Sequence, residues 1–443
     1  MSTAPDSPAV KHALLEVLQR ELLPALAQLI DQLPDGLADA DRAERQVRAG
    51  LLAVARLLLQ AWARAADPAA GRPECPDCRL PLRHKGYREG TSVTTLGPVR
   101  FRQPRYRCTA CGAECYPHDE KLRFLGHAVS WPLAQVVGRL AALLGSFEQA
   151  RDALAEDYGV RLAKQTVAEV AQAAGGEALR HEDGHRHKVA GREAPLPDSP
   201  LAPDTACVFA DGTTVHTEGD WHEVRVATAT ASDARGESVA RQSRARFLPV
   251  ADFAWVLVLL ARAVGYQNAR LRAFIADGAH WLWKLADDYF PSAIQVLDWY
   301  HLAEHVHKAA GGVFGEGSAG AKAWAEARKE ELWQGRPGDA LGAVERELTR
   351  VRSPAKRAAL TELRTYLENN RSRVDYPRYR ALGLPVGSGQ VEAQCKSLVG
   401  ARCKQAGMRN WTYAGAEAVL RLRAAVQDGS YAQLWERRLK PAA

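Results

Sequence analysis

The sequence predicts an α/β fold class, with a mixed-sheet core that an all-helical insertion interrupts. Short apolar strands alternate with helical stretches between Thr205 and Leu297. Two of these strands end on an acid that a helix follows, at Asp277 and at Asp298. A long helical stretch then leads to a Gly-Ser-Gly turn at 387–389. Alternation of this kind is typical of a layered α/β core.

The composition is that of a globular protein with clustered basic residues. The 443 residues are enough for two to four domains, with 47% hydrophobic and 25% charged residues. The net charge is only +7, but nine Lys and Arg residues stand against three acids within 72–111, and again within 395–440. Most basic runs are solvated surfaces, yet two runs that flank a carboxylate site favour nucleic acid as the partner.

No targeting or membrane segment is predicted. The chain starts with a polar stretch, and the apolar stretch 51–62 is interrupted by Arg56 and is too short to span a bilayer. We therefore expect a cytoplasmic protein without a membrane partner.

Residues 1–68 are predicted to form a helical N-terminal region. Leucines recur at helical spacing from Leu14 to Leu29, Pro34-Asp35-Gly36 breaks the run, and a second helix is expected from about Arg42 to Ala66. We expect this hairpin to pack on the core or on another subunit.

Residues 70–120 have the layout of a zinc ribbon. Two Cys-x-x-Cys pairs, separated by residues 79–107, supply four thiolates for a structural, tetrahedral Zn²⁺. Gly86, Gly90 and Gly97-Pro98 are expected at hairpin turns. Cys115 and His118 are expected to be bystanders. The four predicted zinc ligands are Cys75, Cys78, Cys108 and Cys111.

The ribbon is rich in arginine, which favours phosphate contacts over a purely structural role. The DNA-contacting residues predicted here are Arg100, Arg102 and Arg105.

Residues 121–182 are predicted to be helical and to include a helix-turn-helix. Gly159 marks the turn, and Lys164 and Gln165 lead the second helix, where they would contact DNA. Two packed helices without DNA contacts give the same pattern. Residues 183–204, rich first in histidine and then in proline, are predicted to be a linker.

Residues 205–300 and 384–425 are predicted to form the catalytic core. Three strands, a helix, a strand, a helix and a strand resemble the order of a ribonuclease H-like fold. Asp211 and Asp277 would then end two strands that lie side by side. Residues 301–383 form the helical insertion. After it, Ser388 is expected to cap a helix that brings Glu392 to the acids as a third carboxylate.

The ordered motifs of this chain resemble those of DDE transposases of Kra-type bacterial insertion sequences, relatives of the Mutator-like superfamily. The resemblance covers roughly residues 70–425. The motifs are Ala210-Asp211-Gly212-Thr213, Ala276-Asp277-Gly278-Ala279, Asp298-Trp299-Tyr300-His301, Gly387-Ser388-Gly389-Gln390-Val391-Glu392 and Gln405-Ala406-Gly407-Met408-Arg409.

The resemblance implies that Asp211, Asp277 and Glu392 are catalytic and hold Mg²⁺ or Mn²⁺ for DNA cleavage and strand transfer. Asp298 competes with Asp277 for the second position. We prefer Asp277 and expect Asp298 and His301 to support the site or to make contacts at a helix start. For His301, a core histidine without a role at the site is an equal alternative. The partners would be the transposon ends and the target DNA, in a nucleoid-associated homodimer or higher oligomer.

Residues 426–443 are predicted to be a basic C-terminal tail. Further DNA contacts are expected before it, from Lys396, Arg402, Lys404 and Arg409. Two other functions stay open: a DNA-binding protein derived from a transposase with an inactive core, and a nuclease of the same fold without strand transfer.

Overall fold

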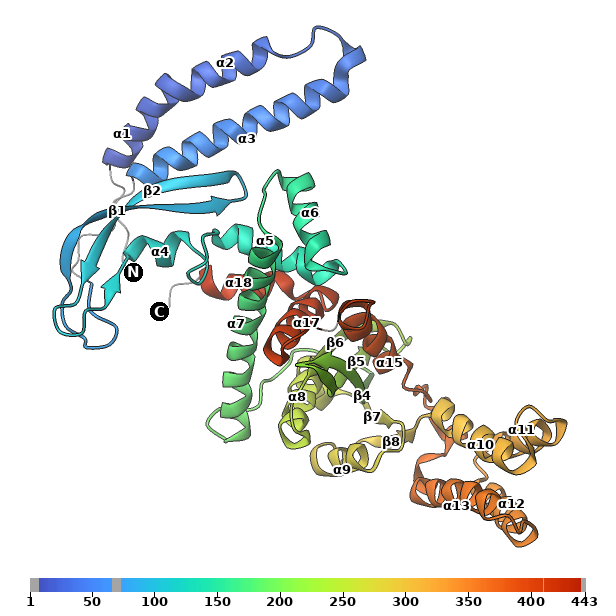
Figure 1. Ribbon diagram of the computed structural model, residues 1–443. Coiled ribbons are helices and arrows are strands. Elements are labelled where there is room, and N and C mark those ends of the chain that lie inside the picture. The colour runs from blue at the N-terminus through green and yellow to red at the C-terminus, as the bar shows by residue number, and fades with distance from the viewer. Residues whose placement is uncertain (1–7, 66–72, 409, 440–443) are drawn as a thin grey trace. The chain divides into compact units, whose positions relative to one another are not determined.

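The computed structural model describes residues 8–65, 73–408 and 410–439. The chain forms two compact units, Met1–Ala174 and Gly175–Ala443 (Figure 1). Their boundary falls within the helix α7 (Lys164–Ala190). None of the described helices is long and apolar enough to cross a membrane.

The first unit begins with a helical hairpin, as the leucine spacing predicts. Its first arm is α1 (Pro8–Val17), the π-helical turn η1 (Leu18–Leu22) and α2 (Leu23–Asp31). The short η2 (Leu37–Asp39) leads into the second arm, α3 (Ala40–Ala65).

A three-stranded antiparallel sheet follows, in the order β1-β2-β3. Its strands are β1 (Arg83–Thr94), β2 (Gly97–Arg107) and β3 (Glu114–Cys115). On one face, Val99 and Phe101 pack against Ala63 of α3. The predictions of turns at Gly86 and Gly90 were wrong, because both glycines lie inside β1. Gly90 lies inside β1, where a Cβ would lie 2.7 Å from the Phe101 ring, so glycine is required by the close approach of that ring.

Helices complete the first unit. They are α4 (Pro117–Leu122), α5 (Trp131–Leu143), α6 (Phe147–Tyr158) and the first part of α7. Ser146 caps α6 by accepting from the amide of Gln149, and Gly159 ends it with φ = 65°. Two helices therefore flank a glycine turn, as the sequence predicts.

The prediction of a linker from residue 183 was wrong for 183–190, because α7 continues to Ala190. The polar composition that suggested a linker belongs to a packed helix. Arg186 is 3% exposed and donates to Asp183 and to Asp252 of α8 (Val250–Ala263). Polar residues that are paired in this way can be buried without loss of stability.

The second unit contains a five-stranded mixed sheet in the order β6-β5-β4-β7-β8. The pairs β4–β5 and β5–β6 are antiparallel, whereas β4–β7 and β7–β8 are parallel. The α/β class with a mixed sheet is therefore confirmed. The strands are β4 (Thr205–Thr217), β5 (Asp220–Ser232), β6 (Ser238–Arg246), β7 (Leu271–Ala276) and β8 (Ile294–Leu297).

Helices cover both faces of this sheet, so the first six residues of β4 are all buried. Helix α8 and α9 (His280–Tyr289) lie on one side, and α15 (Gly389–Gln394) and α17 (Tyr413–Gln427) on the other (Figure 1). A 3-10 turn, η3 (Tyr266–Asn268), precedes β7.

Between β8 and α15 the chain is helical, as predicted. The elements are α10 (Trp299–Phe314), α11 (Ala319–Trp333), α12 (Pro337–Arg350), α13 (Pro354–Asn369), η4 (Arg371–Arg373) and α14 (Tyr376–Ala381). After α15 come the π-helical η5 (Cys395–Gly400) and α16 (Ala401–Cys403). The predicted C-terminal tail is partly a helix, α18 (Tyr431–Leu439), and residues 440–443 lie outside the described chain.

Candidate functional site

The four predicted zinc ligands lie together in the first unit. The Sγ atoms of Cys75, Cys78, Cys108 and Cys111 all lie within 4.8 Å of one another. Three of the separations are 3.8 Å (Cys75–Cys78), 3.5 Å (Cys75–Cys111) and 3.9 Å (Cys78–Cys108). A tetrahedral zinc with Zn–S bonds of about 2.3 Å separates its sulfurs by roughly 3.8 Å. The cluster could therefore hold a metal ion such as zinc.

The two Cys-x-x-Cys loops have the same backbone fold. The amide of Cys75 donates to Leu80 O and that of Cys108 to Ala113 O, both at 2.8 Å. Four residues after each first cysteine, the chain enters the left-handed region, at Arg79 (φ = 59°) and Gly112 (φ = 78°). The repeat shows that both loops present their thiols in the same way.

Backbone amides favour the thiolate form in one loop. The amides of Cys111 and Ala110 donate to Cys108 and lower its pKa to about 6. Because metal ligation requires thiolates, these amides prepare the site for a cation. Cys115 packs beside the cluster and His118 lies against Phe101, and neither belongs to the group of four.

The candidate acids of the second unit follow neighbouring parallel strands. Phe209 of β4 pairs with Ile275 of β7, so Asp211 and Asp277 each lie two residues beyond that pair. Ala276 pairs with Leu297 of β8, which puts Asp277 and Asp298 at matching positions. The sequence was wrong in ending β4 at Asp211, because pairing with β5 carries the strand on to Thr217.

Asp211 is half-buried and sits in an unfavourable place for a negative charge. Burial raises its pKa, and the charge of Asp277 raises it further. Opposing these effects, the amide of Gly212 donates to Oδ1 at 2.6 Å, and the thiol of Cys395 donates to Oδ2 at 3.5 Å. His301 also favours the ionised form through its charge. A bound cation would likewise stabilise the ionised form of Asp211.

The turn after β7 is held by the helical insertion. Asp277 Oδ1 accepts from the amide of Ala279 at 2.9 Å, and Asp277 O accepts from the hydroxyl of Tyr366 in α13 at 2.6 Å. Burial raises the pKa of Tyr366, and Asp277 and Asp298 raise it further, so the hydroxyl stays protonated and donates. Gly278 has φ = +101°, and a Cβ there would lie 2.8 Å from the Tyr366 ring.

Asp298 is fully buried and caps α10, which agrees with the expected contact at a helix start. Its Oδ1 accepts from the amides of Tyr300 (2.6 Å) and His301 (3.0 Å), and its Oδ2 accepts from the amide of Ser388. Both carboxylate oxygens are thus engaged by backbone donors. This arrangement suits a positioning role.

Glu392 lies in the first turn of α15. The expectation that Ser388 caps this helix with its side chain was wrong. Its hydroxyl instead donates to Glu392 Oε1 at 3.0 Å. Asp298, Ser388 and Glu392 therefore form a continuous hydrogen-bonded path from β8 to the third candidate acid.

The three acids belong to neighbouring elements of the fold, but their carboxylate oxygens are not gathered at one point. In the described part of the chain, the four cysteines are the one group of three or more potential ligands gathered closely enough to hold a metal ion. Asp211 and Asp277 interact through their charges, and Glu392 interacts with Cys395, the neighbour of Asp211.

Sequence reasoning missed several residues around these acids. Cys395 contacts Asp211, Lys404 donates to Thr213, and Tyr366 holds Asp277. The position of Cys395, three residues after Glu392, was an available signal, because residues at this spacing share a helix face. Nothing local marks Tyr366, which is 89 residues from its partner.

The predicted DNA contacts differ in exposure. Lys164, Gln165, Lys396 and Lys404 are exposed, as are Arg100 and Arg102. Arg105 is half-buried and paired with Glu114. Arg409 lies outside the described residues.

The prediction for Arg402 was wrong. Its side chain is fully buried, and its guanidinium lies 4.9 Å from the centroid of the Trp411 ring. Burial lowers its pKa to about 10. A buried guanidinium that packs on an indole cannot reach a phosphate.

A scan against models of known protein families finds no match, and a search of curated proteins finds none either.

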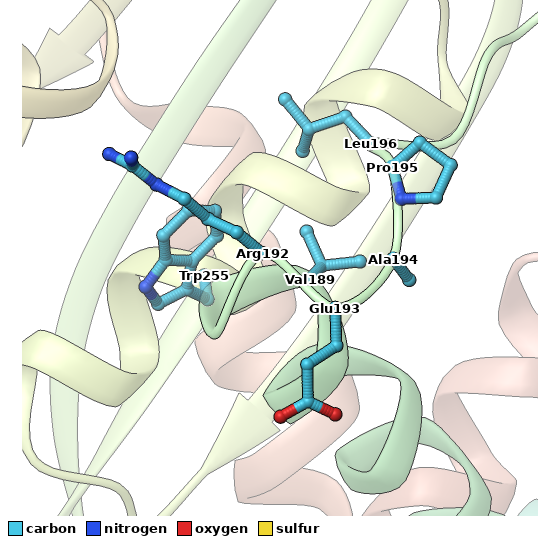
Figure 2. A pocket seen from close by; sticks show the side chains of 7 residues that line it. All are labelled: Val189, Arg192, Glu193, Ala194, Pro195, Leu196 and Trp255. Atoms are coloured by element: carbon cyan, nitrogen blue, oxygen red, sulfur yellow. The ribbon is translucent and has the colours of Figure 1, made fainter.

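A surface pocket of about 440 Å³ lies at the end of α7 (Figure 2). It contains none of the candidate acids. Its lining residues are Val189, Arg192, Glu193, Ala194, Pro195, Leu196 and Trp255.

Proposed function

We propose that this protein is a DDE-type DNA transposase with a ribonuclease H-like core. The observation that carries the proposal is the pairing of β4 with β7, which puts Asp211 and Asp277 at matching positions on adjacent parallel strands. The sheet order β6-β5-β4-β7-β8 supports the proposed core, because it puts β4, which carries Asp211, next to β7, which Asp277 follows.

The three acids suit a divalent cation by their chemistry, and they would have to come closer together than in this structure to hold one. Asp211, Asp277 and Glu392 offer only carboxylate oxygens, the ligands that Mg²⁺ and Mn²⁺ prefer. Burial and the charge of Asp277 raise the pKa of Asp211, and a bound cation would oppose both effects. When bound there, such cations neutralise the phosphate and activate the attacking oxygen.

The chain itself would orient the reaction. Tyr366 and Asp298 hold the backbone beside two of the acids, and Ser388 orients Glu392. Water would hydrolyse a phosphodiester at the element's end, and the freed 3′-hydroxyl would then attack a phosphodiester of the target and displace its 3′-oxygen. Lys396 and Lys404, which are exposed near Glu392 in the chain, would contact the DNA backbone.

The test is a transposition assay with the DNA that flanks this gene, where short inverted repeats are expected. The wild-type chain should give excised and joined products that require Mg²⁺ or Mn²⁺. Asp211→Asn and Glu392→Gln should abolish both while DNA binding survives, whereas Asp288→Asn, on the exposed side of α9, should retain activity. Nicking without joined products would identify a nuclease instead. Binding without cleavage would identify a DNA-binding protein with an inactive core.

A further inference from the structure

The β1–β2 hairpin contains a bulge that changes which side chains share a face. His84 pairs with Tyr106, and the next pair is Tyr87 with Pro104, so two residues of β1 stand opposite one residue of β2. Gly86 lies in this bulge with φ = +95°, a conformation that glycine adopts readily.

Without the bulge, His84 and Tyr87 would point to opposite faces, because side chains alternate along a strand. With it, their rings lie together, with centroids 5.1 Å apart, and His84 also contacts Tyr106 at 5.4 Å. The bulge therefore gathers three rings on one face of the hairpin.

Two arginines of β2 share this face with the rings. Arg102 stacks over Tyr87, with its guanidinium 4.3 Å from the ring centroid, and Arg100 is exposed two residues earlier. Tyr87 remains 54% exposed. Pro104, Glu89 and Thr91 lie on the same face, with Glu89 opposite Arg102 and Thr91 opposite Arg100. We call the surface formed by His84, Tyr87, Arg100, Arg102 and Tyr106 the ribbon face.

The other face of the hairpin is already used by the fold. Val99 and Phe101 are buried against α3, and Gln103 is fully buried. Tyr116 and Arg88 also form a stacked pair, but Arg88 is ion-paired with Asp119. Arg83 and Arg107 of the hairpin are also exposed, but the ribbon face is where a guanidinium stacks on a ring as exposed as Tyr87.

We propose that the ribbon face binds unpaired DNA, with a base stacked on the side of the Tyr87 ring that Arg102 leaves uncovered and with Arg100 and Arg102 contacting the flanking phosphates. The inference rests on the proposed function, since it takes DNA as the ligand. Flat rings beside guanidinium groups on an open sheet suit exposed bases, which stack on aromatic side chains whatever their sequence.

Duplex DNA fits this surface less well. The faces of its bases are covered by their neighbours in the stack, so Tyr87 would find no flat partner there. A duplex would offer the arginines its phosphates and the base edges in its grooves, but no open base face for Tyr87. Unpaired nucleotides arise where a strand is opened or cut, as the proposed reaction requires at an element end.

Fluorescence anisotropy can test this with the full zinc-loaded chain and an oligonucleotide of about 20 nucleotides, single-stranded or paired. No Mg²⁺ or Mn²⁺ is added, so cleavage does not interfere. Tyr87→Ala should weaken binding of the single strand about 10-fold or more and that of the duplex by less than about 3-fold. Tyr87→Phe should keep wild-type affinity, as should Phe314→Ala, which removes an exposed ring at the end of α10.

A second measurement is independent of affinity. Ultraviolet crosslinking of a single strand that contains bromodeoxyuridine should attach it to the peptide carrying Tyr87. Equal losses for both DNA forms, no loss with Tyr87→Ala, or crosslinks confined to other peptides would overturn the inference and leave the proposed function standing. A wild-type chain that binds neither DNA form would overturn both.

Discussion

The carboxylate of Asp298 accepts the backbone amide of Ser388, a residue 90 positions later in the chain. Ser388 in turn donates its hydroxyl to Glu392 at 3.0 Å. The end of β8 thereby orients the helix that carries the third candidate acid. The two ends of the helical insertion therefore lie together, and the bond from Trp299 N to Val386 O (2.8 Å) joins the same two segments.

Replacing Asp298 should be costly, because three amides would lose their acceptor in a buried place. We expect Asp298→Ala to lower the free energy of unfolding by about 3 kcal/mol. Urea unfolding measures this. Ser318→Ala, which removes a single cap at the start of α11, is the matched control and should cost about 1 kcal/mol. Equal losses in the two variants would contradict the bridging role of Asp298.

We expect the hydroxyl of Tyr366 to position Asp277 for metal binding rather than to contribute mainly to the stability of the fold. Tyr366→Phe removes the hydroxyl that holds Asp277 O and keeps the ring that stacks on His305 at 3.9 Å. We expect metal-dependent cleavage to require a several-fold higher Mn²⁺ concentration, since the Asp277 turn is less well fixed. A metal titration of the cleavage rate measures this shift.

The control is Tyr376→Phe, because the hydroxyl of Tyr376 donates in the same way to Leu297 O of β8 at 3.1 Å. It should lower stability without shifting the metal requirement. Identical metal curves for the two variants would show that Tyr366 is merely structural.

Zinc binding should require the four clustered cysteines and should not require the neighbouring Cys115. We expect wild-type chain to bind about one zinc, and Cys78→Ser or Cys108→Ser to lose it and to unfold the small sheet, since three ligands hold zinc poorly. Cys115→Ser should retain the metal. Metal content by mass spectrometry decides between these outcomes, and a zinc-free wild-type chain with a folded ribbon would refute the expectation.

The buried ion pairs of Glu182 with Arg244 and Arg421 should make the protein less stable as the pH falls into the acidic range. Burial would raise the pKa of Glu182, but Arg244, Arg421 and Arg246 outweigh it and lower the pKa to about 2. A lowered pKa in the folded state adds stability above the ordinary value of 4.5, which is lost as the pH falls from there toward about 2. We therefore expect Glu182→Gln to cost about 3 kcal/mol at pH 7 and much less at pH 3.

Urea unfolding of wild type and Glu182→Gln at both pH values measures this difference. Glu177→Gln is the control, because Glu177 pairs with the exposed Arg180 and should contribute little at either pH. A cost of Glu182→Gln that does not change with pH would show that the carboxylate is not ionised in the network.

Much of the fold could be predicted because its signals are local. The spacing of the cysteine pairs determines which thiols can meet, and Gly159 and Ser146 mark a helix end and a helix start within a few residues. The apolar runs of β4, β7 and β8 predict buried strands, and each is followed by an acid. Each of these features depends on neighbours along the chain, so the sequence alone contains it.

Other features depend on which surfaces meet, and only the tertiary structure decided them. Residues 183–190 look like a polar linker until the partners of Arg186 on other elements are known. Arg402 and Lys404 stand two residues apart in one basic run, yet the first is buried and the second exposed. The bond between Asp298 and Ser388 spans 90 residues. Composition and residue spacing cannot predict such contacts, because the energy of these contacts comes from burial and pairing between segments that are far apart in the chain.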